Sequence, residues 1–220
     1  MLLKIDLHVH SHYSSDSTIT PEQLVFYAGK SGLDGVAVTD HDRLDGALEI
    51  AKHTSFLIIP GIEVSSRNGH IVGLNVQEPI AKGMTAEETV VKIHDAGGIA
   101  VACHPVALFK GSLGKHVNSK FDAIEVVNSS ALPFGYSVRR SMDIASRLRL
   151  PRVAGSDAHY ALEIGSAYTL AEAESNVNDV VKAICNGKCQ PFGRAIPLKV
   201  RLKRRSSLFA RSSSIQEAAR

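Results

Sequence analysis

The sequence lacks the features that mark several protein classes. It contains no tryptophan, and its three cysteines, Cys103, Cys185 and Cys189, have neither the even number of a disulfide framework nor the spacing of a zinc finger. No run approaches the roughly 20 apolar residues that cross a bilayer, and Asp6 and His8 interrupt the segment where a signal peptide would be apolar. We therefore expect a cytoplasmic protein with reduced cysteines and no membrane association.

The composition that is present is typical of a folded, soluble domain. Hydrophobic residues make up 44% of the chain and charged residues 21%, and 220 residues can bury the core of one α/β domain. The net charge of +3 is uneven, because only Glu217 opposes the basic residues Arg194, Lys199, Arg201, Lys203, Arg204, Arg205, Arg211 and Arg220. We expect one domain over residues 1–193 and a basic, Ser-rich, solvated tail over 194–220, with a nucleic-acid docking arm as the alternative role of the tail.

Strand-like and helix-like segments alternate along the chain. Short apolar runs predict strands at residues 2–7, 35–39, 56–60, 71–76, 99–103, 123–127 and 152–154. Capping boxes at Thr20 and Thr85 and amphipathic periodicity predict helices at 21–31, 44–53, 86–96, 138–148 and 177–186. Near-continuous apolar strands between such helices are typical of a largely parallel sheet that is buried on both faces. About seven strands in this order predict a closed or nearly closed α/β barrel.

Nine residues that can ligate a metal lie where the predicted strands end: His8, His10, Asp16, His41, Glu63, His70, His104, Asp157 and His159. The carboxyl ends of the strands form the active face of an α/β barrel. One residue separates His8 from His10, and one separates Asp157 from His159, so the two-residue period of a strand turns each pair to one side. Imidazole with carboxylate suits Zn, Mn, Fe or Co, and a carboxylate shared among so many histidines implies more than one ion.

Several stretches of the sequence resemble the motifs of the PHP family, named for its polymerase-associated and histidinol-phosphatase members. They are His8-Val9-His10-Ser11 with Asp16, Thr39-Asp40-His41, Pro60-Gly61-Ile62-Glu63, Gly69-His70-Ile71, His104-Pro105 and Ser156-Asp157-Ala158-His159. The resemblance spans residues 6–159 and fills all nine ligand positions in order and type. It implies a distorted (β/α)7 barrel of the TIM-barrel-like type, so residues 1–193 are identified as a PHP metallophosphoesterase barrel.

The resemblance also implies how two or three divalent ions, of Zn, Mn or Fe, are held. The first ion would be held by His8, His10, Glu63 and Asp157, the second by Glu63, His70 and His104, and the third by Asp16, His41 and His159. Glu63 would bridge two ions. The residues implied in catalysis are His8, His10, Glu63, Asp157 and His159. Such a cluster predicts direct attack of a metal-bridging hydroxide on phosphorus, without a side-chain nucleophile.

We therefore expect a metal-dependent phosphoric ester hydrolase that acts on a phosphomonoester or a nucleotide. About thirty residues separate His70 from His104, too few for the inserted domain that larger nucleotide-hydrolysing relatives carry there. The alternative is a nuclease, or a nucleic-acid-associated PHP module that uses the basic tail. An amidohydrolase also begins its barrel with H-x-H, but the bridging candidate here, Glu63, follows the third strand rather than the fourth.

Other polar residues near the predicted strand ends receive supporting roles or none. We expect Asp40 to orient a ligand or cap a helix, and Asn128 to line the pocket or cap a turn. Cys103 is expected to pack inside the barrel without a chemical role. The candidate phosphate clamps, which are more often solvated surface charges, are Arg43, Lys115, Arg139 and Arg140.

Overall fold

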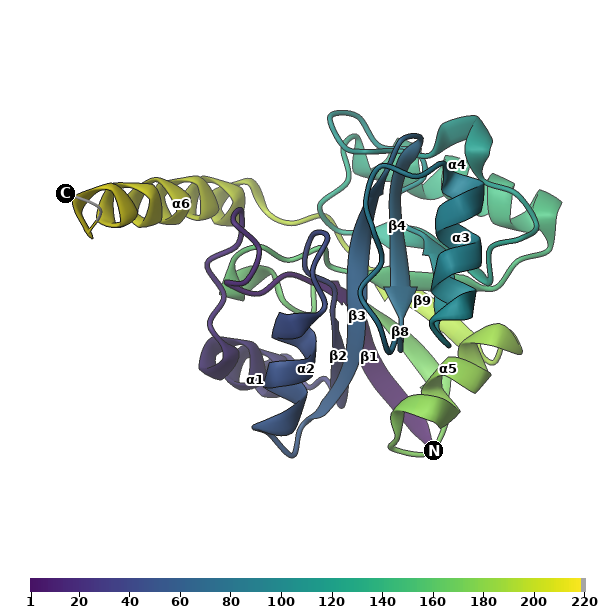
Figure 1. Ribbon diagram of the computed structural model, residues 1–220, viewed down its shortest axis with the longest axis horizontal. Helices are drawn as coiled ribbons and strands as arrows, with labels where there is room; N and C mark the ends of the chain where they lie inside the picture. Colours follow the sequence, from purple (N-terminus) through teal and green to yellow (C-terminus); the bar gives the residue numbers. More distant parts are fainter. Residues whose placement is uncertain (219–220) are drawn as a thin grey trace.

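The computed structural model describes the backbone of residues 1–218 and the side chains of residues 1–209. Its centre is a nine-stranded sheet that curls into a nearly closed barrel with helices around it (Figure 1). The strands are β1 (Leu2–Val9), β2 (Gly35–Val38), β3 (Leu57–Ser66), β4 (Gly69–Leu74), β5 (Ile99–Ala102), β6 (Ala123–Asn128), β7 (Arg152–Gly155), β8 (Ala167–Glu172) and β9 (Cys189–Gly193). Their order across the sheet is β7-β6-β5-β4-β3-β2-β1-β8-β9. The predicted α/β, TIM-barrel-like fold is confirmed.

The helices begin where the sequence supplies caps. Those formed within residues 1–218 are α1 (Pro21–Lys30), α2 (Asp45–Lys52), α3 (Ala86–Asp95), α4 (Phe134–Leu148), α5 (Val177–Cys185) and α6 (Leu198–Ala218), with short 3-10 turns at Gly114–His116 and Ala161–Glu163. The Thr20 hydroxyl accepts from the Gln23 N–H at 3.3 Å, and the Thr85 hydroxyl accepts from the Glu88 N–H at 3.2 Å. These are the two predicted capping boxes, and they satisfy N–H groups that the first turn of a helix leaves unpaired.

The sheet is less parallel than the apolar strands predicted. β1, β2 and β3 pair in parallel, as do β5, β6 and β7. β4 is antiparallel to both β3 and β5. Only Arg67 and Asn68 connect β3 to β4, and so short a connection permits no parallel crossover between these two strands. β8 and β9 extend the sheet beyond β1 as antiparallel strands that the sequence analysis did not predict.

The barrel closes where the segment after β7 reaches the end of β1. Val9 and Ala158 form a parallel bridge, the Asp157 N–H donates to the His8 carbonyl at 2.8 Å, and the His10 N–H donates to the Ala158 carbonyl at 2.9 Å. Residues from the two ends of the barrel sequence therefore share one edge, although about 150 residues separate them in the chain.

Two apolar clusters lie on opposite faces of the barrel wall. The outer cluster packs strand residues such as Val36 and Ile62 against helix residues such as Ile93. The inner cluster combines strand residues such as Ile5 with Ile184 of α5. The polar side chains at the carboxyl ends of the strands therefore lie above an apolar barrel interior.

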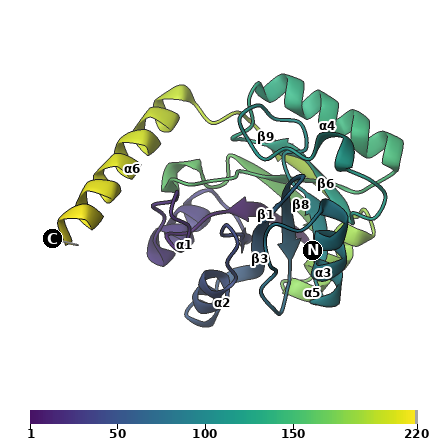
Figure 2. The same cartoon turned by 45° about the horizontal axis from the view of Figure 1, so that its top comes forward.

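Helix α6 follows β9 and extends away from the barrel in both views (Figures 1 and 2). Its first turns still contact the barrel, because the Arg201 guanidinium donates to the carbonyls of Ser129 at 3.1 Å and Ser130 at 3.2 Å. The basic segment predicted as a solvated tail thus forms a helix through Ala218, while Arg220 and the side chain of Arg211 lie outside the described part of the chain. None of the helices in residues 1–218 is long and apolar enough to pass through a bilayer.

Candidate metal centre

The nine residues selected from the sequence meet at one end of the barrel. β1 and the loop after it supply His8, His10 and Asp16, the β3–β4 hairpin supplies Glu63 and His70, and the segments after β2, β5 and β7 supply His41, His104, Asp157 and His159. Six of them, His8, His10, Glu63, His104, Asp157 and His159, are buried, and the other three are half-buried. Parallel strand direction explains this convergence, because the carboxyl ends of β1, β2, β5 and β7 open at the same mouth.

His8, His10, Glu63 and Asp157 form the first group of converging atoms. The Nε2 atoms of His8 and His10 lie 3.2 Å from each other, and they lie 3.2 and 3.1 Å from Glu63 Oε2. Asp157 Oδ1 lies 3.8 Å from His8 Nε2 and 3.5 Å from His10 Nε2. Two imidazole nitrogens and two carboxylate oxygens therefore face one small volume.

The second oxygen of Glu63 faces a different pair of histidines. Glu63 Oε1 lies 2.9 Å from His70 Nδ1 and 2.9 Å from His104 Nε2. Cys103 packs in the inner apolar cluster, as expected, and its thiol also donates to the same oxygen at 3.5 Å. One carboxylate is thus shared between two groups of potential ligands.

Asp16, His41 and His159 form the third group, at the more exposed side of the mouth. Asp16 Oδ2 lies 3.4 Å from His41 Nε2 and 3.2 Å from His159 Nε2. The other ring nitrogen of His41 lies 3.4 Å from Glu63 Oε2, which links this group to the first. His10 also belongs to this neighbourhood, since one of its ring nitrogens lies within 4.8 Å of the ligand atoms of all three residues.

Buried charges determine the protonation of the site. Burial alone would lower the pKa of His8, but the carboxylates of Glu125 and Asp157 outweigh it and hold that pKa well above its ordinary value. Burial alone would raise the pKa of Glu63, but the charge of His8 outweighs it and holds that pKa well below its usual range. Burial and the charge of His10 lower the pKa of His159 to about 4. Ionised buried carboxylates require positive charge beside them, which protonated imidazoles or a divalent cation can supply.

The donor set fits a divalent metal ion. Nitrogen and oxygen ligands bound at about 2.0–2.1 Å in tetrahedral geometry lie about 3.4 Å apart. The separations of 3.1 to 3.8 Å within the first group have this size. In the third group, Asp16 Oδ1 is buried without a hydrogen-bond partner among the described residues. Each group therefore presents atoms that an ion could bind.

Side chains outside the nine hold the ligands in place. Glu125 Oε1 accepts from His8 Nδ1 at 3.1 Å, and Glu125 Oε2 accepts from the His104 backbone N–H at 2.8 Å. The Asn128 amide donates to Asp157 Oδ2 at 3.1 Å, and its oxygen accepts from the Ser130 N–H at 3.0 Å, so this side chain has both of its expected roles, in the pocket and as a turn cap. Asp40 accepts from the Ser11 N–H and hydroxyl, so it orients the loop after β1. Glu125 was not predicted from the sequence, where its only signal is an acidic residue inside an otherwise apolar strand.

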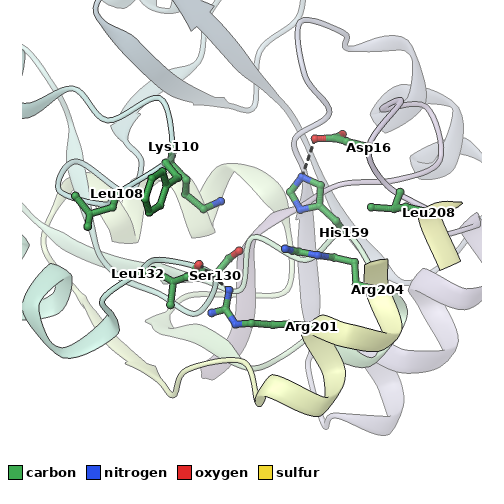
Figure 3. Close-up of a pocket in the computed structure, with 10 residues that line it drawn as sticks. Asp16, Leu108, Lys110, Ser130, Leu132, His159, Arg201, Arg204 and Leu208 are labelled. Atoms are coloured by element: carbon green, nitrogen blue, oxygen red, sulfur yellow. Dashed lines mark hydrogen bonds and ion pairs between the residues drawn. The ribbon is translucent and has the colours of Figure 1, made fainter. Parts of the chain in front are cut away.

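The four candidate phosphate clamps are exposed, which agrees with the expectation that such residues are more often solvated surface charges. Arg43 pairs with the exposed Asp45 on α2 at 2.6 Å, and none of the four borders the pocket beside the site. That pocket is bordered instead by Lys110, Arg201 and Arg204 (Figure 3). Lys110, which lies in the loop after β5, forms an ion pair with Asp157. No spacing rule connects a loop lysine and two tail arginines with a strand end, which explains why the sequence analysis missed them.

The sequence and the fold are similar to those of known proteins. Residues 6–92 match the family model of the PHP domain, and residues 135–189 match that of a PHP-associated region. An uncharacterised protein from Methanocaldococcus jannaschii is 34% identical over 141 residues, which cover 58% of this chain and 82% of that protein. A 5′-3′ exoribonuclease from Haemophilus influenzae is 40% identical over 93 residues, which cover 39% of this chain but only 33% of the exoribonuclease.

Among solved structures, a similar fold occurs in a two-domain protein from Bacteroides vulgatus that contains a predicted PHP-like metal-dependent phosphoesterase. The TM-score is 0.71 at 18% sequence identity, and the match covers 88% of this chain and 65% of that protein. At this identity the similarity concerns the fold, and it agrees with the nearly closed barrel described above.

Proposed function

The chain belongs to the PHP family and is a hydrolase of phosphoric esters, and we propose that it hydrolyses a phosphomonoester or a nucleotide with two or three divalent ions. The convergent histidines and carboxylates make a divalent-metal site, for which Zn, Mn or Fe is the ion we propose. The observation that carries the proposal is the position of Glu63, whose two oxygens face two separate sets of histidines within 2.9 to 3.2 Å. A carboxylate in this position is suited to bridge two ions.

The nine residues divide into three sets in this proposal. His8, His10, Glu63 and Asp157 would hold one ion, Glu63, His70 and His104 a second, and Asp16, His41 and His159 a third. When bound, such ions neutralise phosphate oxygens and bring the pKa of a coordinated water close to neutrality. No serine or cysteine nucleophile is then needed.

The surrounding residues orient these ligands and add charge at the mouth. Glu125 and Asn128 fix the positions of His8, His104 and Asp157 through the hydrogen bonds given above, which limits the motion of the ligand atoms. Burial would lower the pKa of Lys110, but the adjacent Asp157 outweighs it and raises that pKa, so the side chain stays an ammonium. Its positive charge favours an anionic substrate at the mouth.

Metal-dependent turnover of a simple phosphomonoester tests this function. The purified protein should hydrolyse p-nitrophenyl phosphate in the presence of Mn²⁺ or Zn²⁺, lose this activity after chelation, and regain it when metal is restored. His8→Ala should abolish turnover and reduce bound metal, whereas His53→Ala, at an exposed position after α2, should do neither. An amide or a lactone should not be hydrolysed. Equal turnover by chelated protein, or by His8→Ala, would refute the proposal.

A nuclease is the second candidate, because α6 carries exposed basic residues next to the site and part of the chain is similar to an exoribonuclease. Lys199 and Arg205 are exposed on α6, where they could contact a nucleic-acid backbone. Deleting α6 would be a poor test, since the deletion also removes Arg201 and Arg204 from the pocket. A double variant, Lys199→Gln with Arg205→Gln, is the better test. It should cleave a short 5′-phosphorylated RNA more slowly, and this cleavage should depend less on salt concentration, while p-nitrophenyl phosphate turnover persists. An unchanged salt dependence would exclude the contact arm.

A further inference from the structure

We propose that the pocket between α6 and the loop after β5 receives the leaving group of the substrate, and that Arg204 and Arg201 bind a second anionic group on it. This inference rests on the proposed phosphoesterase function. It assigns the first turns of α6 a role in substrate binding. The substrate class it implies is a phosphoester whose leaving group ends in a phosphate or a carboxylate.

The pocket adjoins the third group of candidate ligands. It has a volume of about 310 Å³, a size that suits one small ligand, and Asp16 and His159 form part of its wall. Figure 3 shows Arg201 and Arg204 extending from α6 on one side of the hollow and Lys110 lying on the other. A phosphate bound at the metal centre would therefore place the rest of its molecule in this pocket.

Arg201 is held rigidly without losing its charge. Its guanidinium donates to the carbonyls of Ser129 and Ser130, and its Nε donates to the Ile196 carbonyl at 3.1 Å. These three acceptors are neutral, so they fix the orientation of the guanidinium but do not neutralise it. A rigid guanidinium is well suited to bind phosphate or carboxylate, because less conformational entropy is lost on binding.

Arg204 borders the pocket and has a buried carboxylate, Glu163, behind it. Arg204 Nη1 lies 3.5 Å from Glu163 Oε1, a distance longer than that of a strong charged hydrogen bond. The other oxygen, Glu163 Oε2, accepts from the backbone N–H groups of His159 at 2.9 Å and Tyr160 at 3.2 Å. Glu163 is fully buried, so a ligand in the pocket can contact Arg204 but not Glu163.

The charges around the pocket therefore leave an excess of positive charge. Lys110, Arg201 and Arg204 line the pocket, against the one carboxylate of Asp16. Lys110 is paired with Asp157, Asp16 lies against His41 and His159, and Glu163 lies 3.5 Å from Arg204. The apolar side chains of Leu108 and Leu132 complete the wall and suit the carbon skeleton of a leaving group. An anionic group at the far end of that skeleton would face Arg201 and Arg204.

Matched pairs of substrates test this anion site. Monophosphates and bisphosphates of α,ω-alkanediols with three to six carbons differ only in the second anionic group. In the metal-loaded wild-type protein, we expect kcat/KM for the bisphosphate to exceed that for the monophosphate by about tenfold or more at one chain length, the size of effect that a charged hydrogen bond produces. Binding of the non-hydrolysable alkane bisphosphonates and monophosphonates, measured by calorimetry, should show the same preference.

Variants of α6 assign the preference to Arg204. Arg204→Gln should reduce the bisphosphate preference to about one while monophosphate turnover continues, and Arg204→Lys should retain part of it. Lys203→Gln removes one positive charge from the adjacent, exposed position and should keep the full preference. Monophosphate turnover without any bisphosphate preference in the wild type would overturn the anion site and leave the phosphoesterase intact. Equal losses on both substrates in Arg204→Gln would also overturn it, and absence of all turnover would refute the function itself.

Discussion

Glu63 occupies the centre of the site because each of its two oxygens faces a different set of histidines. Its position in β3 is enclosed on every side, and the side chain is buried. An ionised carboxylate in such a place is stable only beside compensating positive charge. This requirement explains why five histidines surround one acid: His8, His10, His41, His70 and His104.

We predict that Glu63→Gln will lower bound metal by at least one ion per chain and reduce phosphomonoester turnover by about 100-fold or more. The amide preserves the size of the side chain but removes the charge that two ions would share. Elemental analysis of the dialysed protein, together with turnover at saturating metal, measures both effects. Glu49→Gln, an exposed change on α2, serves as the control. Wild-type metal content in Glu63→Gln would contradict this role.

Glu125 illustrates how a residue that touches no substrate can set the strength of metal binding. It supports the His8 ring with one oxygen and the His104 backbone with the other. We predict that Glu125→Gln will weaken metal affinity by about 10- to 100-fold, as other losses of support behind a ligand do, while the protein stays folded. Competition with a chromophoric chelator gives the affinity, and circular dichroism checks the fold. Unchanged affinity would show that the His8 ring needs no such support.

The nine candidate ligands and two supporting residues, Asp40 and Asn128, could be predicted from the sequence, but the other residues around the site could not. His8 with His10 and Asp157 with His159 lie at predicted strand ends, where the period of a strand gives their direction. Glu125, Lys110 and Arg204 contact the site or its pocket through tertiary packing. Their neighbours in space are distant in sequence, so no local pattern marks them.

The junction between β7 and β1 is the part of the fold on which the site depends most closely. Gly155 ends β7 directly against His8, and a Cβ at this position would lie 2.4 Å from the His8 Cβ and 2.8 Å from Glu125 Oε1. The absence of a side chain at Gly155 thus allows the last parallel strand to approach the first. The approach in turn places Asp157 beside His8 and His10.

We predict that Gly155→Ala will lower the free energy of unfolding by about 1 to 3 kcal/mol, because the methyl group must displace a packed side chain. The change should also reduce metal content, since His8 would move. Gly135→Ala in the first turn of α4, where nothing lies within 4 Å, should instead stabilise the protein by up to about 1 kcal/mol. Denaturant unfolding of the two variants gives both values. Equal stability of the two would contradict the close packing at Gly155.

The seven strands β1 to β7 and the helices α1 to α5 were predictable from the sequence, whereas β8, β9 and α6 were not. In β8, buried residues alternate with partly exposed ones, and β9 contains Pro191 and is mostly exposed at the edge of the sheet. Neither strand has the continuous apolar run that marked the others. In α6 the many basic and serine residues resembled a disordered tail, and its contacts through Arg201 and Arg204 could be found only from the structure.

The barrel and its metals should also depend on each other for stability. Ions that bind only the folded chain add to its stability, by about 4 kcal/mol when their concentration exceeds the Kd a thousandfold. For a chain of this length such a loss lowers Tm by on the order of 10 °C. We therefore predict that chelation will lower the unfolding temperature by this amount and that Mn²⁺ or Zn²⁺ will restore it. Calorimetric scans with and without chelator measure the change, and identical scans would indicate that the folded barrel gains nothing from the ions.

In the proposed function, side chains from separate strands hold metal ions around Glu63 at one mouth of the barrel. An anomalous-difference map of crystals grown with saturating Mn²⁺ or Zn²⁺ tests it. We predict one peak between Glu63 Oε2 and the ring nitrogens of His8 and His10, and a second between Glu63 Oε1 and those of His70 and His104. A map from fully loaded crystals without a peak within bonding distance of Glu63 would show that Glu63 binds no ion and would refute the proposed metal centre.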